Sequence, residues 1–102
     1  MSARRRRLVV RPDAQADFRS VLLYTRERWG PDQVRRYRTQ LNQTLRSLRD
    51  YPERGRARDE YFPGCRSLPV EQYVVFYYRT DEEIIIVRIL HSNQDATGRV
   101  VP

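Results

Sequence analysis

The chain contains no lysine, and among its 102 residues there is one histidine and one cysteine. His91 and Cys65 cannot build a cluster of metal ligands by themselves, so we predict neither a metal site nor a cofactor. A single cysteine excludes a disulfide within the chain and suits the reducing cytoplasm, where we place the protein. The four glycines are isolated, so no phosphate-binding loop is present.

Long apolar stretches are also missing. No run approaches the ~20 apolar residues of a membrane-spanning helix, and we predict no contact with a membrane. The arginine-rich start is not followed by the apolar segment of a secretory signal. The length is that of one compact domain, so we expect residues 1–102 to form a single domain, with a basic arm at 1–7 and a polar tail at 96–102.

All twenty basic residues are arginines, and the net charge is +7. Arginine favours two-point contacts with carboxylates and phosphates, and a basic surface attracts nucleic acid, an acidic protein or an anionic membrane. The preference for arginine also fits a compositional bias of the source genome. Arg4–Arg7 could contact phosphates, although a frayed and solvated terminus is the simpler interpretation.

Two apolar runs near the C-terminus predict a β-hairpin joined by the polar turn Thr80–Glu83. Both runs are apolar on both faces, which is typical of central strands. Upstream, Pro12 and the Gly30-Pro31 pair mark the starts of two helices with apolar stripes at helical spacing; we place Trp29 on the first stripe. Pro69 predicts an edge position for its strand. The predicted elements are strands at Leu8–Arg11, Cys65–Val70, Tyr73–Arg79 and Ile84–Leu90, and helices at Pro12–Trp29 and Pro31–Asp50.

The predicted fold is therefore α+β, with the order β-α-α-β-β-β and an antiparallel helical hairpin on one face of a small, mainly antiparallel sheet. The polar segment Glu53–Pro63 is expected to be a loop. Because the helices cover only one face of a sheet that is apolar on both, some apolar surface should remain for a partner.

Four residues on or beside the C-terminal strands are candidates for contacts with a target: Arg66, Arg79, Arg88 and His91. Arg66, Arg88 and His91 could clamp a phosphate and donate a proton, as a metal-independent ribonuclease requires. Alternatively, Arg79 and Arg88 pair with Glu82, Glu83 or Glu71 along the strand surface. A group of His91, Ser92 and Asp95 lacks the backbone motif that a serine hydrolase needs.

The order and spacing of several short patterns resemble the ParE branch of the RelE/ParE toxins, which are the toxin halves of type II toxin–antitoxin modules. The similarity extends from about Leu8 to Asp95. The residues that carry it are Pro12-x-Ala14-x-x-Asp17-Phe18, Trp29-Gly30, Tyr37, Leu41, Tyr51-Pro52, Gly64-x-Arg66, Tyr73-Val74-Val75-Phe76-Tyr77 and Ile89-Leu90-His91 with Gln94-Asp95.

This resemblance implies the fold described above, a neutralising ParD-like antitoxin and, for the ParE branch, poisoning of DNA gyrase. The mRNA-cleaving members carry basic and aromatic residues at and after the end of the last strand. Here His91 is followed by Ser92-Asn93-Gln94-Asp95, which favours a toxin that binds and is not an enzyme. An mRNA interferase, or an inactive homologue that only partners an antitoxin, remains an alternative.

Basic and apolar residues on the helices predict the antitoxin surface. Leu23 lies off the apolar face of the first helix, between Arg19 and Arg26, and Arg35 and Arg38 lie on one flank of the second helix. We expect an acidic, partly disordered antitoxin to bind these five residues. We expect no sequence-specific DNA binding by the toxin alone.

Overall fold

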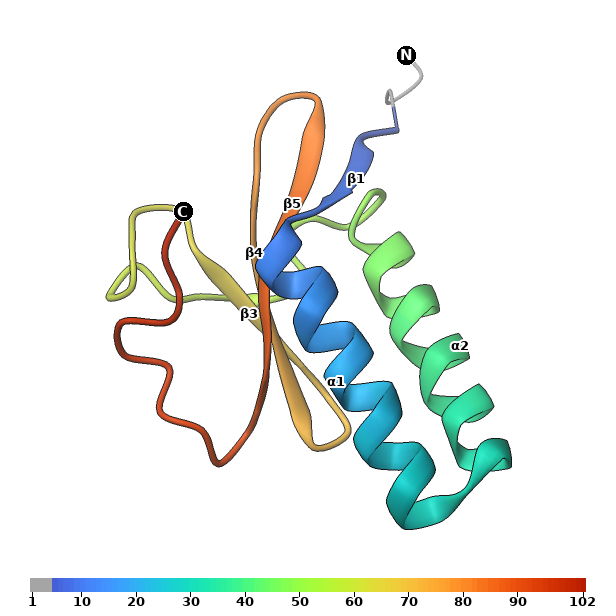
Figure 1. Ribbon diagram of the computed structural model, residues 1–102. Helices are drawn as coiled ribbons and strands as arrows, with labels where there is room; N and C mark the ends of the chain where they lie inside the picture. Colours follow the sequence, from blue (N-terminus) through green and yellow to red (C-terminus); the bar gives the residue numbers. More distant parts are fainter. Residues whose placement is uncertain (1–4) are drawn as a thin grey trace.

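The computed structural model describes residues 5–102 and has the predicted α+β architecture (Figure 1). Helices α1 (Pro12–Trp29) and α2 (Pro31–Ser47) cover one face of a five-stranded sheet. The strand order is β1-β5-β4-β3-β2, antiparallel except for the parallel pair β1–β5. The strands are β1 (Arg7–Val10), β2 (Arg56–Ala57), β3 (Arg66–Val70), β4 (Tyr73–Arg79) and β5 (Glu83–His91).

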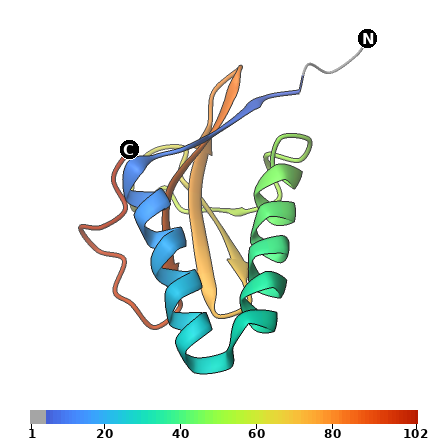
Figure 2. The ribbon, with the colours of Figure 1, turned by 45° about the vertical axis from the view of Figure 1, so that its right-hand side comes forward.

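The two helices form the predicted antiparallel hairpin, which Figure 2 shows from the side. Gly30 joins them with φ of 88°, a conformation that favours glycine, and Pro31 starts α2. α2 ends at Ser47, earlier than the predicted Asp50, because the amides of residues 48–50 bond three residues back and tighten into a turn. Neither helix within the described residues is long and apolar enough to cross a bilayer.

β2 was not predicted, because Arg56 and Ala57 are both exposed and show no apolar periodicity. It pairs with β3 only opposite Arg66 and Ser67. The predicted edge position of the whole strand is wrong, because β3 lies between β4 and β2; Pro69 itself has a neighbouring strand on one side only.

The first core lies between the helices and the sheet. Ala14 and Val21 of α1 and Leu41 and Leu45 of α2 pack there against inward-facing residues of β3, β4 and β5. We had predicted that Trp29 belongs to the apolar stripe of the first helix, but it is not part of this core; its side chain is 66% exposed at the end of α1.

The second face of the sheet is also covered, contrary to the expectation of surplus apolar surface there. Phe76, Val87 and Leu90 pack against Phe62 and Cys65 from the segment between β2 and β3, and against two buried residues of the C-terminal segment, Ala96 and Val100. Figure 1 shows this segment on the side of the sheet away from the helices. The predicted polar loop and polar tail thus supply the cover, through a few apolar residues each.

A β-bulge in β5 changes the alternation of its side chains. Phe76 lies opposite Arg88 and Tyr77 opposite Ile86, so Val87 is the extra residue. Ile86 and Ile89 consequently face the helices, while Val87 and Leu90 face the second core. β1 accompanies β5 only as far as Ile86, and α1 lies beside the remainder of the strand.

Candidate functional site

Asp17 of α1 occupies the edge of β5 that β1 leaves free. Its carboxylate accepts hydrogen bonds from Arg88 Nε at 2.7 Å, from Arg88 Nη2 at 2.9 Å and from the Ile89 amide at 2.9 Å. Both side chains are mostly buried, with 19% of Arg88 and 14% of Asp17 exposed. The hydrogen bond to Asp17 raises the pKa of Arg88.

The partner of Arg88 is therefore not Glu82, Glu83 or Glu71, which we had considered. Arg88 lies opposite Phe76, at the part of β5 that α1 lies beside, so the acid comes from the first helix. Sequence reasoning missed this role of Asp17, although the residue is part of the pattern that opens α1. Its place three residues after buried Ala14 and four before buried Val21 is the signal that could have identified an inward-facing acid.

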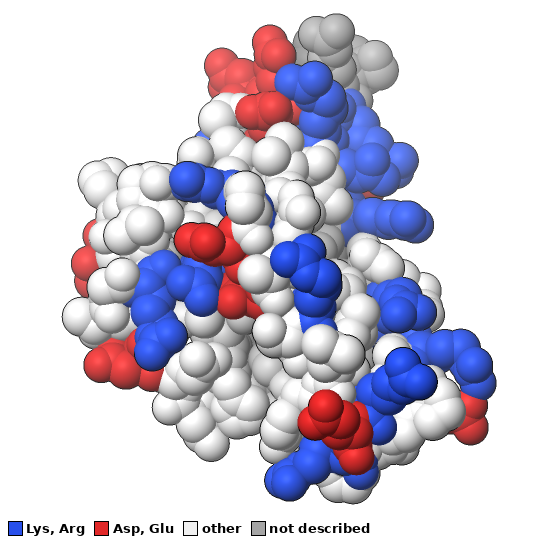
Figure 3. All heavy atoms as spheres, in the orientation of Figure 1, with Lys and Arg blue, Asp and Glu red and all other residues white. Residues whose placement is uncertain are grey.

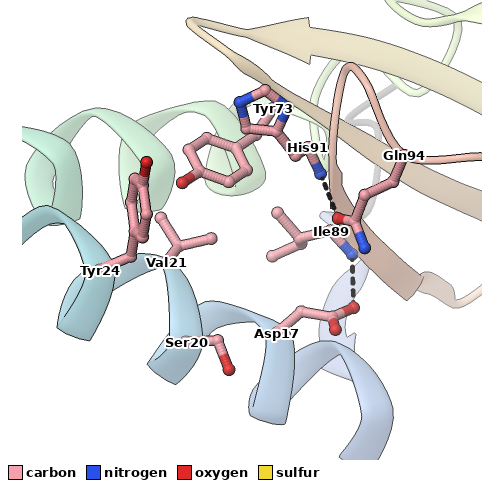
Figure 4. Close-up of a pocket in the computed structure, with 8 residues that line it drawn as sticks. All are labelled: Asp17, Ser20, Val21, Tyr24, Tyr73, Ile89, His91 and Gln94. Atoms are coloured by element: carbon pink, nitrogen blue, oxygen red, sulfur yellow. Dashed lines mark hydrogen bonds between the residues drawn. The ribbon is translucent and has the colours of Figure 1, made fainter.

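A pocket of about 390 Å³ lies between α1 and the C-terminal end of β5 (Figure 4). Aromatic side chains form much of its wall: Tyr73 contacts His91 edge-on with ring centroids 5.4 Å apart. Tyr24 stands on α1 across the opening, with the Arg28 guanidinium 5.2 Å from its ring centre. The pocket is lined by Asp17, Ser20, Val21, Tyr24, Tyr73, Ile89, His91 and Gln94.

His91 is held in a turn at the end of β5. Its backbone amide donates to Gln94 Oε1 at 2.8 Å, and its Nδ1 accepts the Asn93 amide at 3.1 Å. A neutral ring in this arrangement carries its proton on Nε2. The side chain thus lines the pocket as a fixed donor and aromatic wall.

The four predicted target residues do not form one site. Arg66 donates to the Gly55 carbonyl at 2.6 Å, and Arg79 pairs with Glu53 at 2.7 Å. Arg66 and His91 lie in strands on opposite sides of β4, opposite Tyr77 and Tyr73. These positions are four residues apart on β4, roughly 13 Å at the usual rise of a strand.

The outer surface of the helical hairpin is rich in arginine, and Figure 3 shows arginine side chains spread over it. The helices carry seven arginines, Arg19, Arg26, Arg28, Arg35, Arg36, Arg38 and Arg46, against four acids, Asp13, Asp17, Glu27 and Asp32. Asp17 pairs with Arg88 of β5 and Asp32 with Arg35, which leaves six helix arginines against two acids, Asp13 and Glu27. All five predicted antitoxin residues are exposed, including Leu23 at 59%.

A groove of about 410 Å³ runs between the two helices and β1, on the other flank of α1 from the pocket. Its floor is apolar, and Arg19 lies at its rim. It is lined by Leu8, Val10, Gln15, Phe18, Arg19, Asn42 and Leu45. Apolar contact beside unpaired positive charge suits a segment that is both acidic and apolar.

The described part of the basic arm, Arg5–Arg7, makes contacts within the molecule. Arg5 bonds Asp50 at two points of 3.2 Å, Arg6 donates to the Thr80 carbonyl, and Arg7 pairs with Glu83. The side chains of Arg5 and Arg7 remain exposed, so the phosphate contact considered for this segment stays a prediction. Arg4 lies outside the described residues.

Comparison with known proteins decides the family. Residues 8–96 match the family described as the ParE toxin of type II toxin–antitoxin systems, parDE. A protein named Toxin ParE1 from Mycobacterium tuberculosis is 37% identical over 90 residues, covering 87% of this chain and 92% of that protein. The chain belongs to the ParE toxin family. The predicted resemblance to the ParE branch is thereby confirmed.

Other relatives support the same family assignment. Toxin ParE from Escherichia coli is 34% identical over 93 residues, covering 90% of each protein. Toxin ParE1 from Caulobacter vibrioides is 30% identical over 87 residues, covering 85% of this chain and 90% of that protein. A solved structure titled as a chromosomal ParDE TA system from P. aeruginosa has the same fold, with a TM-score of 0.72 at 22% identity. It covers 84% of this chain and 95% of that one.

Proposed function

We propose that this ParE-family toxin arrests DNA gyrase in the cytoplasm by binding the enzyme while its DNA is cleaved, and does no chemistry itself. The gyrase target follows from the resemblance to the ParE branch. The observation that supports binding over catalysis is that the candidate catalytic residues are held in other contacts or lie apart. Arg88 is bound at two points by Asp17, and Arg66 by a backbone carbonyl. His91 lies two strands away from Arg66 and is offset from it by four residues along β4.

Ribonuclease chemistry also needs a base that takes the proton of the attacking ribose hydroxyl. Lysine is absent from the chain, and His91 is its only histidine. Its Nδ1 already accepts the Asn93 amide. The alternative, a ribosome-dependent mRNA interferase, would therefore have few side chains that could act as the general base.

Purified toxin should inhibit the supercoiling of plasmid by gyrase and raise the yield of linear DNA trapped with the enzyme. It should leave ribosome-bound mRNA uncut. His91→Ala separates the mechanisms, because a cleaving toxin that uses His91 as its acid should lose about a hundredfold or more in rate. Codon-specific mRNA cleavage by the parent, abolished in His91→Ala, would reverse the assignment. No growth arrest on expression without antitoxin would favour an inactive homologue.

We also propose a ParD-like antitoxin that binds along the helical hairpin, with its apolar side chains in the groove beside Phe18 and its acids near Arg19 and Arg38. The surplus of exposed arginine on the helices supports this placement. The neighbouring reading frame should encode a short protein with an acidic and apolar C-terminal part. Hydrogen exchange should show protection of both helices on binding, and protection confined to residues 54–63 would contradict the placement.

A further inference from the structure

The pocket at the end of β5 is closed to an added strand but open to a side chain. The outward-facing amides of Ile89 and His91 are taken by the Asp17 carboxylate and by Gln94 Oε1. A partner segment therefore finds these backbone donors occupied, and cannot extend the sheet there by the usual ladder of hydrogen bonds. What the pocket does offer is a hollow of about 390 Å³ walled by side chains.

Several polar groups that line this hollow can donate hydrogen bonds. Among the eight residues drawn in Figure 4, hydrogen bonds join only His91 to Gln94 and Asp17 to Ile89. The hydroxyls of Ser20, Tyr24 and Tyr73 form no hydrogen bond with any of the other seven residues. The side-chain amide nitrogen of Gln94 forms none with them either. Burial raises the pKa of Tyr73, with Tyr37 and Tyr24 adding to the effect, so its hydroxyl keeps its proton at neutral pH.

The one acid in the wall does not repel an anion strongly. Both oxygens of Asp17 are engaged, and its charge is balanced by Arg88. A second positive charge, Arg28, stands at the rim above the Tyr24 ring. The pocket thus combines hydrogen-bond donors with a nearby cation, Arg28, and its one acid is paired with Arg88. Such an environment suits an oxyanion.

We propose that this pocket binds a carboxylate, presented as an aspartate or glutamate side chain of the protein that the toxin inhibits. That the carboxylate comes from the inhibited target, and not from the antitoxin, rests on the proposed function. The pocket uses the flank of α1 that carries Ser20 and Tyr24, whereas the groove assigned to the antitoxin uses the flank of Gln15 and Arg19. The two surfaces are therefore separate contacts on one helix.

Two variants test the pocket with little disturbance of the fold. Tyr73→Phe removes only a hydroxyl and keeps the ring contacts with Tyr37 and His91. Gln94→Glu keeps an oxygen for the His91 amide and replaces the free amide donor by a negative charge. Gln43→Glu, at an exposed position of α2, adds the same charge away from the pocket and serves as the control.

The first measurement does not depend on gyrase. Isotope-labelled toxin is titrated with N-acetyl-glutamate amide, with N-acetyl-glutamine amide and with inorganic phosphate, while backbone amide shifts are followed by NMR. Saturable shifts at Ile89, His91 and Gln94 with the glutamate probe alone, lost in Gln94→Glu and retained in Gln43→Glu, support the proposal. Equal response to the glutamine probe, tighter binding of phosphate or no shift at all would overturn it.

The second measurement assigns the occupant. Gyrase inhibition should fall about tenfold in Tyr73→Phe, as expected for losing one hydrogen bond to a charged group, and further in Gln94→Glu. Antitoxin affinity should change less than about twofold, because the pocket lies outside its groove. Full gyrase inhibition by both variants would overturn the target as occupant. If the parent does not inhibit gyrase, the proposed function fails, while the titration still decides whether the pocket binds a carboxylate.

Discussion

Asp17 in α1 and Arg88 in β5, 71 residues apart along the chain, meet through two hydrogen bonds of 2.7 and 2.9 Å. The same carboxylate accepts the Ile89 amide. Asp17 thus joins the first helix to the last strand and balances the charge of a mostly buried arginine. It also accepts a hydrogen bond from a backbone amide at the edge of the sheet. This contact also forms one wall of the pocket beside His91.

Breaking the Asp17–Arg88 pair from one side should be costly. Arg88→Leu should lower the free energy of unfolding by about 3 kcal/mol, because it leaves the mostly buried Asp17 carboxylate without its counter-charge. The double variant Asp17→Asn with Arg88→Leu should recover part of that loss. Arg79→Leu is the matched control, since its pair with Glu53 is about half exposed and should contribute under about 1 kcal/mol. Urea denaturation measures all three, and equal effects of the two arginine variants would contradict the interpretation.

The hydroxyl of Tyr77 should hold the turn after α2. It accepts the Gly55 amide at 2.8 Å and donates to the Pro52 carbonyl at 2.7 Å, in a buried site. Tyr77→Phe should lower the free energy of unfolding by about 2 kcal/mol, because two buried backbone groups lose their partner. Tyr51→Phe, at a residue 67% exposed, should change stability little. Thermal melting of both proteins tests this, and similar melting temperatures would argue against the role of Tyr77.

Gly55→Ala should lower the free energy of unfolding by an amount similar to the loss of the Tyr77 hydroxyl. A methyl group at this position would lie 2.7 Å from the Tyr77 ring and hydroxyl, and 2.8 Å from the Ser67 carbonyl. Such overpacking typically costs about 1–3 kcal/mol. Calorimetry of Gly55→Ala beside Gly64→Ala separates steric crowding from backbone strain, because Gly64 has φ of 87° but open space around it.

Stability should decline in alkaline solution through Cys65. Burial raises the pKa of its thiol from the ordinary 9.0 to about 11. The folded state holds this proton more tightly than the unfolded chain, so its contribution is complete below about pH 9 and is lost as the pH rises to about 11. Buried Tyr73 and Tyr77, whose pKa values burial also raises, act in the same direction. Urea midpoints measured across this range should fall less steeply in Cys65→Ala, and identical slopes would remove Cys65 as a cause.

Exposed arginines of the helices should set the strength of antitoxin binding. Replacing Arg19 and Arg38 together by alanine should weaken binding roughly tenfold at low salt, from about 0.5–1 kcal/mol for each exposed charge contact. The difference should shrink at high salt, where such contacts are screened. Arg56→Ala, on the far strand β2, is the control. Titration calorimetry at two salt concentrations measures the effect, and equal weakening by Arg56→Ala would point to net charge alone.

The sequence by itself determined the elements with strong local signals. α1 has the predicted bounds because proline at its first turn and Gly30-Pro31 at its end act over a few residues. β4 likewise matches the predicted run of aromatic and β-branched residues. The order of elements and the family also follow from patterns that can be read along the chain.

Only the tertiary structure decided which distant residues meet. β2 has too few residues to show a period, and Ala96 and Val100 become buried because the C-terminal segment crosses the second face of the sheet. The partner of Arg88 depends on α1 lying beside the end of β5. Turn and period signals act over a few residues, whereas the pairing of Asp17 with Arg88 exists only once the whole sheet and helix have packed together.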